Sequence, residues 1–228
     1  MARDPLVDEL ERATAPGRVL GGEFDRVAFA SDASMYHLIP RAVVLAADET
    51  DVAAVLRVAR RRRVPVTFRA AGTSLSGQGV TDGILVEVAR HWRKAWVEDA
   101  GRRIRARPGM IGAQLNALLA PHGTRLGPDP SSLAACTLGG ILANNSSGPC
   151  SGVEQNSYHT LESLRLVLAD GTELSTSDAD GDADAALRAK APGVHAGLLE
   201  LRRGLLANES LRAKVERKYR TKNTTGYG

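Results

Sequence analysis

Apolar residues occur along this chain in short blocks whose spacing alternates between that of strands and that of helices. The run VVLA at 43–46 is typical of a buried strand, and residues 49–62 carry apolar side chains at helical spacing. Two more strands are expected at 64–69 and 84–89. The pattern therefore predicts a β-α-β unit whose second strand runs directly into a glycine-rich segment.

The rest of the chain mixes strands and helices without an internal repeat. A first helix is expected within MARDPLVDELERAT, followed by a polar segment, 21–41. We divide the chain into an N-terminal helical segment, 1–41, and two subdomains, 42–106 and 107–228. The later elements predicted are strands near 94–98 and 102–107, a helix at 111–119, a hairpin of 163–169 with 172–175, and helices at 194–206 and 208–219.

The segment RAAGTSLSGQG, residues 69–79 and here called loop 1, has the composition of an anion-binding loop. Glycines let a backbone approach a ligand, and consecutive N–H groups in such turns form a nest for anionic oxygens. The hydroxyls of Thr73, Ser74 and Ser76 add donors, which suits a pyrophosphate. A tight turn between strands is the alternative. The lysine of a P-loop is absent, and a strand follows instead of the helix of a Rossmann fingerprint.

A second small-residue segment, GPDPSSLAACTLGGILANNSSG at 127–148, is here called loop 2. It lies within a long irregular stretch, 124–158, and such long loops in compact domains are usually functional. Gly139 and Gly140 have no bulk to hold a ligand off the backbone, while Asn144 and Asn145 supply polar groups. A disordered surface loop is the alternative interpretation. Because loop 1 has the same character, we favour a pair of ligand-binding loops.

Composition narrows the class of protein. No apolar run approaches the roughly 20 residues that span a bilayer, and the N-terminal sequence resembles neither a signal nor a transit peptide. Cys136 and Cys150 form no CxxC motif, so reduced thiols and a cytoplasmic location are expected. The histidines are scattered without HxH or HExxH spacing, and we expect no metal site.

The formal charge of +4 permits an anionic ligand without requiring one. Arg57 and residues 60–63 form a basic run that suits either nucleic acid or an acidic partner surface. We favour the solvated end of the helix at 49–62, because cations are stabilised at a helix C-terminus. No aromatic residues alternate with these arginines, so nucleic-acid binding is not expected.

Several blocks, taken together and in order, resemble one known family. The chain is similar to the FAD-binding domain of the vanillyl-alcohol oxidase/p-cresol methylhydroxylase superfamily, in its D-lactate, glycolate and D-2-hydroxyglutarate dehydrogenase branch. The ending KNTTGY is most similar to enzymes that fuse this module to an iron–sulfur region. The matching blocks are FASDASMYHLIPRAVV (29–44), VTFRAAGTSLSGQG (66–79), loop 2 (127–148), LESLRLVLADGTEL (161–174) and RKYRTKNTTGY (217–227).

The resemblance implies an α+β fold in which two α/β subdomains of the PCMH type clasp an extended FAD, without the substrate domain. Thr73 stands where covalently linked relatives carry histidine, so noncovalent FAD is expected. An iron–sulfur cluster would belong only to a C-terminal region beyond residue 228. The residues expected at the cofactor are Arg69, Ala71, Gly72, Thr73, Ser74, Leu75, Ser76, Gly77, Gln78, Pro128, Asp129, Ser132, Cys136, Thr137, Gly139, Gly140, Asn144, Asn145 and Gly148.

The function implied is that of a flavin module in an oxidoreductase acting on a 2-hydroxy acid. No catalytic residue can be transferred, because the family's substrate-binding and metal-ligating residues belong to a later domain. We therefore expect the chain to be inactive alone and to meet its substrate only together with that domain. A non-catalytic phosphate- or nucleotide-binding module is the alternative.

Overall fold

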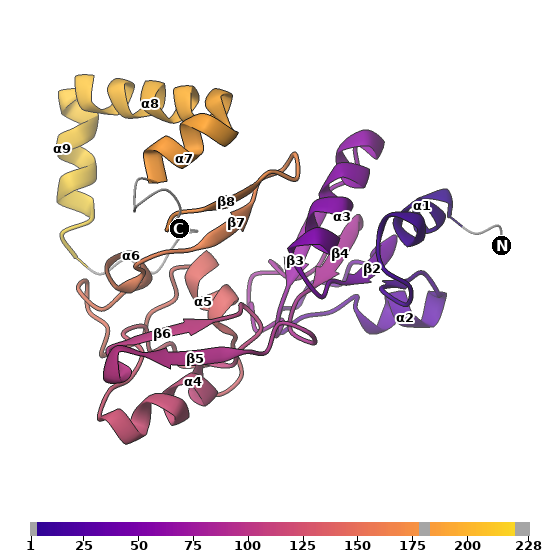
Figure 1. The fold of residues 1–228 in the computed structure, drawn as a ribbon, viewed down its shortest axis with the longest axis horizontal. Helices are drawn as coiled ribbons and strands as arrows, with labels where there is room; N and C mark the ends of the chain where they lie inside the picture. Colours follow the sequence, from indigo (N-terminus) through magenta and orange to yellow (C-terminus); the bar gives the residue numbers. More distant parts are fainter. Residues whose placement is uncertain (1–3, 178–182, 222–228) are drawn as a thin grey trace.

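The computed structural model describes residues 4–177 and 183–221, and its first half is built round a four-stranded sheet (Figure 1). The strands are β1 (Val19–Leu20), β2 (Ala42–Leu45), β3 (Val66–Arg69) and β4 (Ile84–Glu87), in the spatial order β1-β2-β4-β3. The strands β2 and β3 both pair with β4 in parallel, and β1 pairs antiparallel with β2. The carboxyl ends of three strands therefore meet at one edge.

Apolar side chains fill both faces at the centre of this sheet. Every residue of β2 and β4 is buried, as expected for near-continuous apolar strands covered on two sides. The helix α3 (Glu49–Arg62) joins β2 to β3 and covers one face together with α1 (Pro5–Ala13). Because α1 contributes Leu6, Val7 and Leu10 to the core of the sheet, the N-terminal helix and the first subdomain share one hydrophobic core.

The second half begins with an antiparallel hairpin, β5 (Ala95–Glu98) with β6 (Arg103–Ala106). The predicted helix at 111–119 is α4 (Gly112–Leu119), which the short turn η2 (Ala120–His122) extends. A second hairpin, β7 (Arg165–Val167) with β8 (Glu173–Ser175), matches the predicted one. The remaining elements are η1 (Asp99–Gly101), α5 (Leu138–Ala143), α6 (Ser157–Thr160), α7 (Ala183–Lys190), α8 (Pro192–Ala207) and α9 (Glu209–Lys218).

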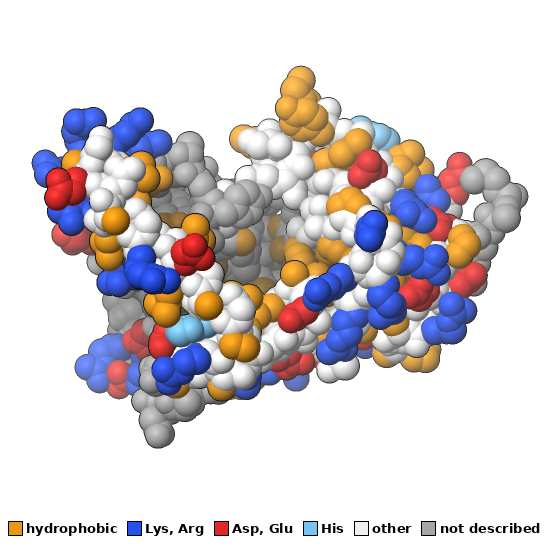
Figure 2. Space-filling model, turned by 90° about the horizontal axis from the view of Figure 1, so that it is seen from above, with side chains coloured by type: hydrophobic (Ala, Val, Ile, Leu, Met, Phe, Trp, Pro, Cys, Tyr) orange, Lys and Arg blue, Asp and Glu red, His pale blue; other side chains and the backbone are white. Residues whose placement is uncertain are grey.

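The two predicted C-terminal helices are confirmed as α8 and α9. In the part of the chain that the structure describes, neither helix contains a buried residue. Leu198 of α8 is 52% exposed and Leu201 is 72% exposed. An open hollow of about 640 Å³ lies between the two helices and is lined by Leu201, Leu205 and Leu211, among others. Figure 2 shows apolar side chains between basic ones on this part of the surface, at the left.

Some segments expected to be irregular contain short helices. In the polar segment 21–41, residues Glu23–Ala28 form α2, and in the loop at 124–158 the structure forms α5 and α6. The sequence analysis placed Gly139 and Gly140 in an irregular loop, whereas Thr137 begins α5 by accepting a hydrogen bond from Gly140 N–H. Residues 222–228, which include the whole of KNTTGY, and residues 178–182 lie outside the described part.

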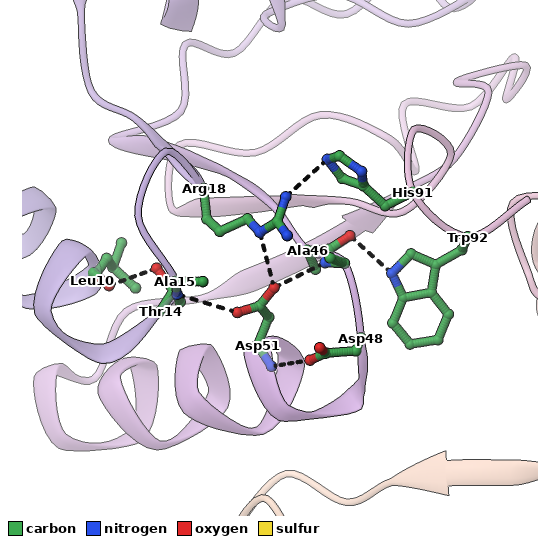
Figure 3. A network of polar contacts seen from close by, with 10 residues as sticks. Leu10, Thr14, Ala15, Arg18, Ala46, Asp48, Asp51, His91 and Trp92 are labelled. Atoms are coloured by element: carbon green, nitrogen blue, oxygen red, sulfur yellow. Dashed lines mark hydrogen bonds and ion pairs between the residues drawn. The ribbon is translucent and has the colours of Figure 1, made fainter.

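A polar network ties the N-terminal segment to the sheet (Figure 3). The buried carboxylate of Asp51, in the first turn of α3, accepts a hydrogen bond from Ala47 N–H at 2.9 Å. It also forms an ion pair with Arg18 at 3.4 Å, and Arg18 contacts His91 Nε2 at 3.1 Å. Beside it, Trp92 Nε1 donates to the carbonyl of Ala46. This one carboxylate therefore joins the segment before β1 to the segment after β2 and, through Arg18, to the segment after β4.

We predict that Asp51→Ala lowers the free energy of unfolding by about 2–4 kcal/mol, because the change leaves a partly buried arginine and an amide without their acceptor. Asp48→Asn is the matched control, since asparagine caps a helix about as well as aspartate. Urea unfolding of both variants measures the difference. Equal stability of the two variants would contradict the role of Asp51 in the network.

Candidate functional site

The parallel strands bring the first candidate loop to the edge of the sheet where β3 and β4 end. Loop 1 begins at Arg69, the last residue of β3, and Val88 follows the last residue of β4. Val88 N–H donates to the carbonyl of Arg69 at 2.9 Å, so the two strand ends lie side by side. Loop 1 therefore leaves the sheet directly beside the segment that follows β4.

Close backbone packing brings loop 2 to the same place. A β-carbon placed on Gly109 would lie 2.6 Å from the carbonyl oxygen of Val88, so only glycine fits there. Pro108, the residue before Gly109, packs just as closely against Gly139, because a β-carbon placed on Gly139 would lie 2.6 Å from that of Pro108. Gly139 N–H also donates to the Pro108 carbonyl at 2.9 Å. The chain of contacts from Arg69 through Val88 and Pro108 thus joins the two loops.

Loop 1 presents a run of unpaired backbone donors. Within residues 4–177 and 183–221, the N–H groups from Ala71 to Ser74 have no hydrogen-bond partner. Gly72 and Gly77 adopt positive φ values of 67° and 74°, which favour glycine. Successive free N–H groups next to a left-handed residue form the concavity that binds anionic oxygens. The prediction that loop 1 is a donor-rich turn agrees with this geometry.

Side chains of loop 1 give it an internal frame and one cation. Ser74 Oγ accepts from Ser76 N–H at 3.1 Å and from Gln78 N–H at 3.3 Å, and it donates to the Gln78 side chain. Arg69 is partly buried, and its guanidinium lies 2.9 Å from where a β-carbon of Gly72 would be. A positive charge therefore stands beside the free N–H groups, as an anion requires.

Loop 2 contributes surface rather than free donors. In the first turn of α5, Leu138 N–H donates to Met110, Gly139 N–H to Pro108 and Gly140 N–H to Thr137. The hydrogen-bonding groups of this helix end are thus already satisfied. Gly140 is exposed, and a β-carbon placed on it would meet only Thr137 Oγ1, at 3.7 Å. Loop 2 therefore presents an open face of small residues.

Asp129 holds the two ends of loop 2 together. It accepts from Ser151 Oγ at 2.6 Å and from Gly148 N–H at 3.0 Å. Hydrogen bonds from Ser151, Cys150 and Gly148 outweigh partial burial and lower the pKa of the Asp129 carboxyl. A β-carbon on Gly148 would overlap the Asp129 carbonyl, so a larger side chain would push these two ends apart. Asp129 and Gly148 therefore hold loop 2 in shape.

A buried asparagine joins the end of loop 2 to α6. Asn145 has a positive φ of 43°, and its side-chain oxygen accepts from Ser157 N–H at 3.2 Å. The hydroxyl of Ser157 is buried without a partner among the described residues, whereas most buried polar groups are hydrogen-bonded. The sequence prediction missed Ser157 and Ser151. The only signal for them was their place just after loop 2, within SGVEQNSY.

The predicted site residues fall into different environments. Those in loop 1 are partly or fully exposed, whereas those in loop 2 range from exposed to buried. The exposed residues are Ala71, Leu75, Ser76, Gln78 and Gly140; the partly buried ones are Arg69, Gly72, Thr73, Ser74, Gly77, Asp129, Ser132, Gly139 and Asn144; and the buried ones are Pro128, Cys136, Thr137, Asn145 and Gly148. The last group supports loop 2 from within and presents little surface.

Other candidate features have structural partners or no cluster. Arg61 and Arg62 at the end of α3 form ion pairs with Glu9 of α1, while Arg57 donates to the Gly171 carbonyl at 3.4 Å. Burial raises the pKa of the Cys136 thiol, and Cys150 is exposed. In the part of the chain that the structure describes, no three His, Cys, Asp or Glu side chains gather, and no helix is long and apolar enough to cross a membrane.

Comparison with known proteins identifies the architecture. A family model described as FAD binding domain matches residues 40–177, more than half of the chain. The glycolate oxidase subunit GlcD of Escherichia coli is 36% identical over 144 residues, covering 62% of this chain and 29% of that protein. D-2-hydroxyglutarate dehydrogenase of Pseudomonas putida is 32% identical over 194 residues, covering 82% of this chain.

The solved structure of an alkyldihydroxyacetonephosphate synthase has a similar fold. It matches with a TM-score of 0.63 at 22% identity, covering 80% of this chain and 37% of that chain. The predicted fold class is confirmed in that the chain is a mixed α/β structure that matches the FAD-binding portion of longer proteins. This chain spans 29% of the length of the glycolate oxidase subunit and 19% of that of the hydroxyglutarate dehydrogenase.

We predict that alanine has opposite effects on the free energy of unfolding at Gly72 of loop 1 and at Gly140 of loop 2. Gly72→Ala should lower the free energy of unfolding by about 1–2 kcal/mol, because alanine is strained at positive φ, and its β-carbon displaces Arg69. Gly140 lies in helical backbone with open space beside it, so Gly140→Ala should raise the free energy of unfolding by up to about 1 kcal/mol. Urea unfolding compares them, and a loss at both positions would contradict this geometry.

Proposed function

This chain belongs to the family of FAD-binding domains, and on that premise we propose that loops 1 and 2 hold FAD for an oxidoreductase that acts on a 2-hydroxy acid. The observation that carries the proposal is the run of unpaired N–H groups from Ala71 to Ser74 beside the Arg69 guanidinium. A pyrophosphate offers the anionic oxygens that such a run binds.

The residues present fit the cofactor at both loops. In loop 1, Arg69 and the hydroxyls of Thr73 and Ser74 would add charge and donors around the pyrophosphate. In loop 2, the exposed Gly140 leaves room for an extended ligand to lie against the backbone. The Ser157 hydroxyl, buried without a partner among the described residues, is a further group that a ligand would satisfy.

We propose that FAD is held without a covalent bond. Thr73 follows the central glycine of loop 1, and a threonine hydroxyl is a much weaker nucleophile than an imidazole. Affinity would then come from the charge of Arg69, the free N–H groups of loop 1 and the contact surface of loop 2.

The substrate class is proposed from the named relatives, a glycolate oxidase subunit and a D-2-hydroxyglutarate dehydrogenase. In the proposed reaction the α-carbon loses a hydride and the hydroxyl oxygen loses a proton, so that a 2-hydroxy acid becomes a 2-oxo acid. Bound FAD would supply the two-electron acceptor. This chain would position that acceptor, and substrate recognition and the base would come from sequence that the longer relatives have in addition. We also propose a cytoplasmic location, on the sequence evidence of two cysteines without a disulfide or CxxC pattern.

The proposal predicts that the purified protein binds FAD and that Gly140→Leu weakens binding at least about tenfold, roughly 1.4 kcal/mol, because the new side chain fills the open face of α5. Gly197→Leu is the matched control, since Gly197 also lies in a helix, and a β-carbon placed on it would meet no atom within 4 Å. Titration followed by flavin fluorescence measures both affinities. Equal weakening by the two variants would refute the assignment of loop 2.

The same titration separates the alternative function. A nucleotide-binding module would bind ADP as tightly as FAD, whereas a flavin site gains affinity from the flavin half of the ligand. Acid precipitation of the loaded protein should leave the flavin in the supernatant. Flavin that remains in the washed pellet would contradict noncovalent binding.

We predict that FAD bound to this chain is not reduced by 2-hydroxy acids, because hydride transfer needs a substrate held at about 3–3.5 Å beside a positioned base. The measurement is anaerobic mixing of the loaded protein with D-lactate, glycolate or D-2-hydroxyglutarate while the visible absorbance is followed. Dithionite, which reduces flavins directly, is the control for a responsive cofactor. Rapid and saturable bleaching by any of these acids would show that the substrate groups are already present.

A further inference from the structure

The segment from Phe29 to Leu38 lies across loop 1, although it precedes the loop by more than thirty residues. The segment folds back on itself, because Ser31 and His37 form an antiparallel bridge and Leu38 N–H donates to the Ala30 carbonyl. Ala30 is fully buried, which anchors this turn to the protein. Residues 29–38 therefore form an ordered turn. Loop 1, which lies beside this turn, has few hydrogen bonds within itself.

Contacts run from this turn to both ends and to the centre of loop 1. Arg69 donates to the Phe29 carbonyl at 2.9 Å, and its guanidinium lies over the Phe29 ring at 5.7 Å. Ala33 N–H donates to the Gly72 carbonyl at 2.9 Å. These contacts fix the positions of the cation and of the first positive-φ glycine, the two features on which anion binding by loop 1 depends.

Asp32 holds the far end of the loop. Its Oδ2 accepts from Gly79 N–H at 3.0 Å, while Oδ1 accepts from Ser34 N–H at 2.8 Å and so keeps the turn in shape. A β-carbon placed on Gly77 would lie 2.6 Å from the ring of Tyr36, so the same turn also packs against the second positive-φ glycine. One carboxylate thus uses its two oxygens to join two segments.

The negative charge of Asp32 calls for an explanation at a site proposed to bind an anion. Partial burial works to raise the pKa of Asp32, but hydrogen bonds from Ser34 and Gly79 and the charge of Arg69 outweigh it and lower that pKa. The carboxylate is thus ionised at neutral pH. By charge alone it repels an anion, so its benefit to binding must come from the shape it imposes on the loop.

We propose that Asp32 is a positioning residue that holds loop 1 in its anion-binding conformation. The reason is geometric: the two oxygens of one carboxylate fix the turn and the end of the loop at the same time. Its relevance to the cofactor rests on the proposed function, whereas its effect on the loop does not.

The test compares Asp32→Asn with Asp82→Asn, which removes an exposed carboxylate three residues beyond Gly79. Asparagine keeps an oxygen for the Ser34 turn but presents an NH₂ group, not an acceptor, to Gly79. We expect the Gly79 amide of Asp32→Asn to exchange hydrogen at least about tenfold faster and FAD to bind about tenfold more weakly, as when one charge-assisted hydrogen bond is lost. The urea midpoint should fall by no more than the loss of this one hydrogen bond explains, so that the variant is fully folded in both measurements.

The sign of the change in affinity distinguishes positioning from electrostatics. Removal of a negative charge tightens binding of an anion if charge alone acts, and Asp82→Asn reports the size of that effect. Tighter or unchanged FAD binding by Asp32→Asn, or unchanged exchange at Gly79, would overturn the proposal. If the parent protein binds no FAD, the proposed function fails, and the exchange rate at Gly79 alone then decides whether Asp32 positions the loop.

Discussion

The structure depends on one topological constraint, a connection without a helix between two adjacent parallel strands. Parallel neighbours need a crossover of a dozen or more residues, which is usually a helix that satisfies its own backbone groups. Between β2 and β3 the crossover is α3, but between β3 and β4 residues 70–83 form no helix. The N–H groups from Ala71 to Ser74 therefore remain available. The run of free N–H groups in loop 1 follows from this connection more than from any single side chain.

Loop 1 has a few hydrogen bonds of its own around Ser74, and segments distant in sequence supply the rest of its shape. The turn at 29–38 contacts loop 1 along its length, and Val88 fixes its first residue. Loop 2 is joined to the same edge through Pro108 and Gly109, where any larger side chain would clash with backbone. Glycine and proline at this junction therefore serve the approach of two backbones. The two loops act together because these rigid contacts set the distance between them.

Much of the fold was predictable, since strands β2 and β4 and helix α3 have apolar patterns that match their burial. The composition of loops 1 and 2 also singled out two segments that the structure joins at one edge of the sheet. Local patterns did not reveal Asp32 or Ser157, because their importance arises from contacts with residues far along the chain. The helix within loop 2 was not predicted either. Gly139 and Gly140 were expected in an irregular segment, whereas the Thr137 cap and the packing on Pro108 place them in the first turn of α5.

An extended ligand that contacts both loops would add to the contacts that already join the two halves of the protein. Among these, Glu49 of α3 forms an ion pair with Arg165 of β7 at 3.2 Å, and Arg57 donates to the Gly171 carbonyl. The first part has a continuous core of α1, α3 and the sheet, whereas α8 and α9 bury no residue among those described. A ligand that binds only the folded form stabilises it in proportion to the logarithm of its concentration over its Kd. A ligand bound at both loops would therefore stabilise the folded protein as a whole. Its affinity would in turn depend on the contacts of Val88, Pro108 and Gly139 that hold the two loops together.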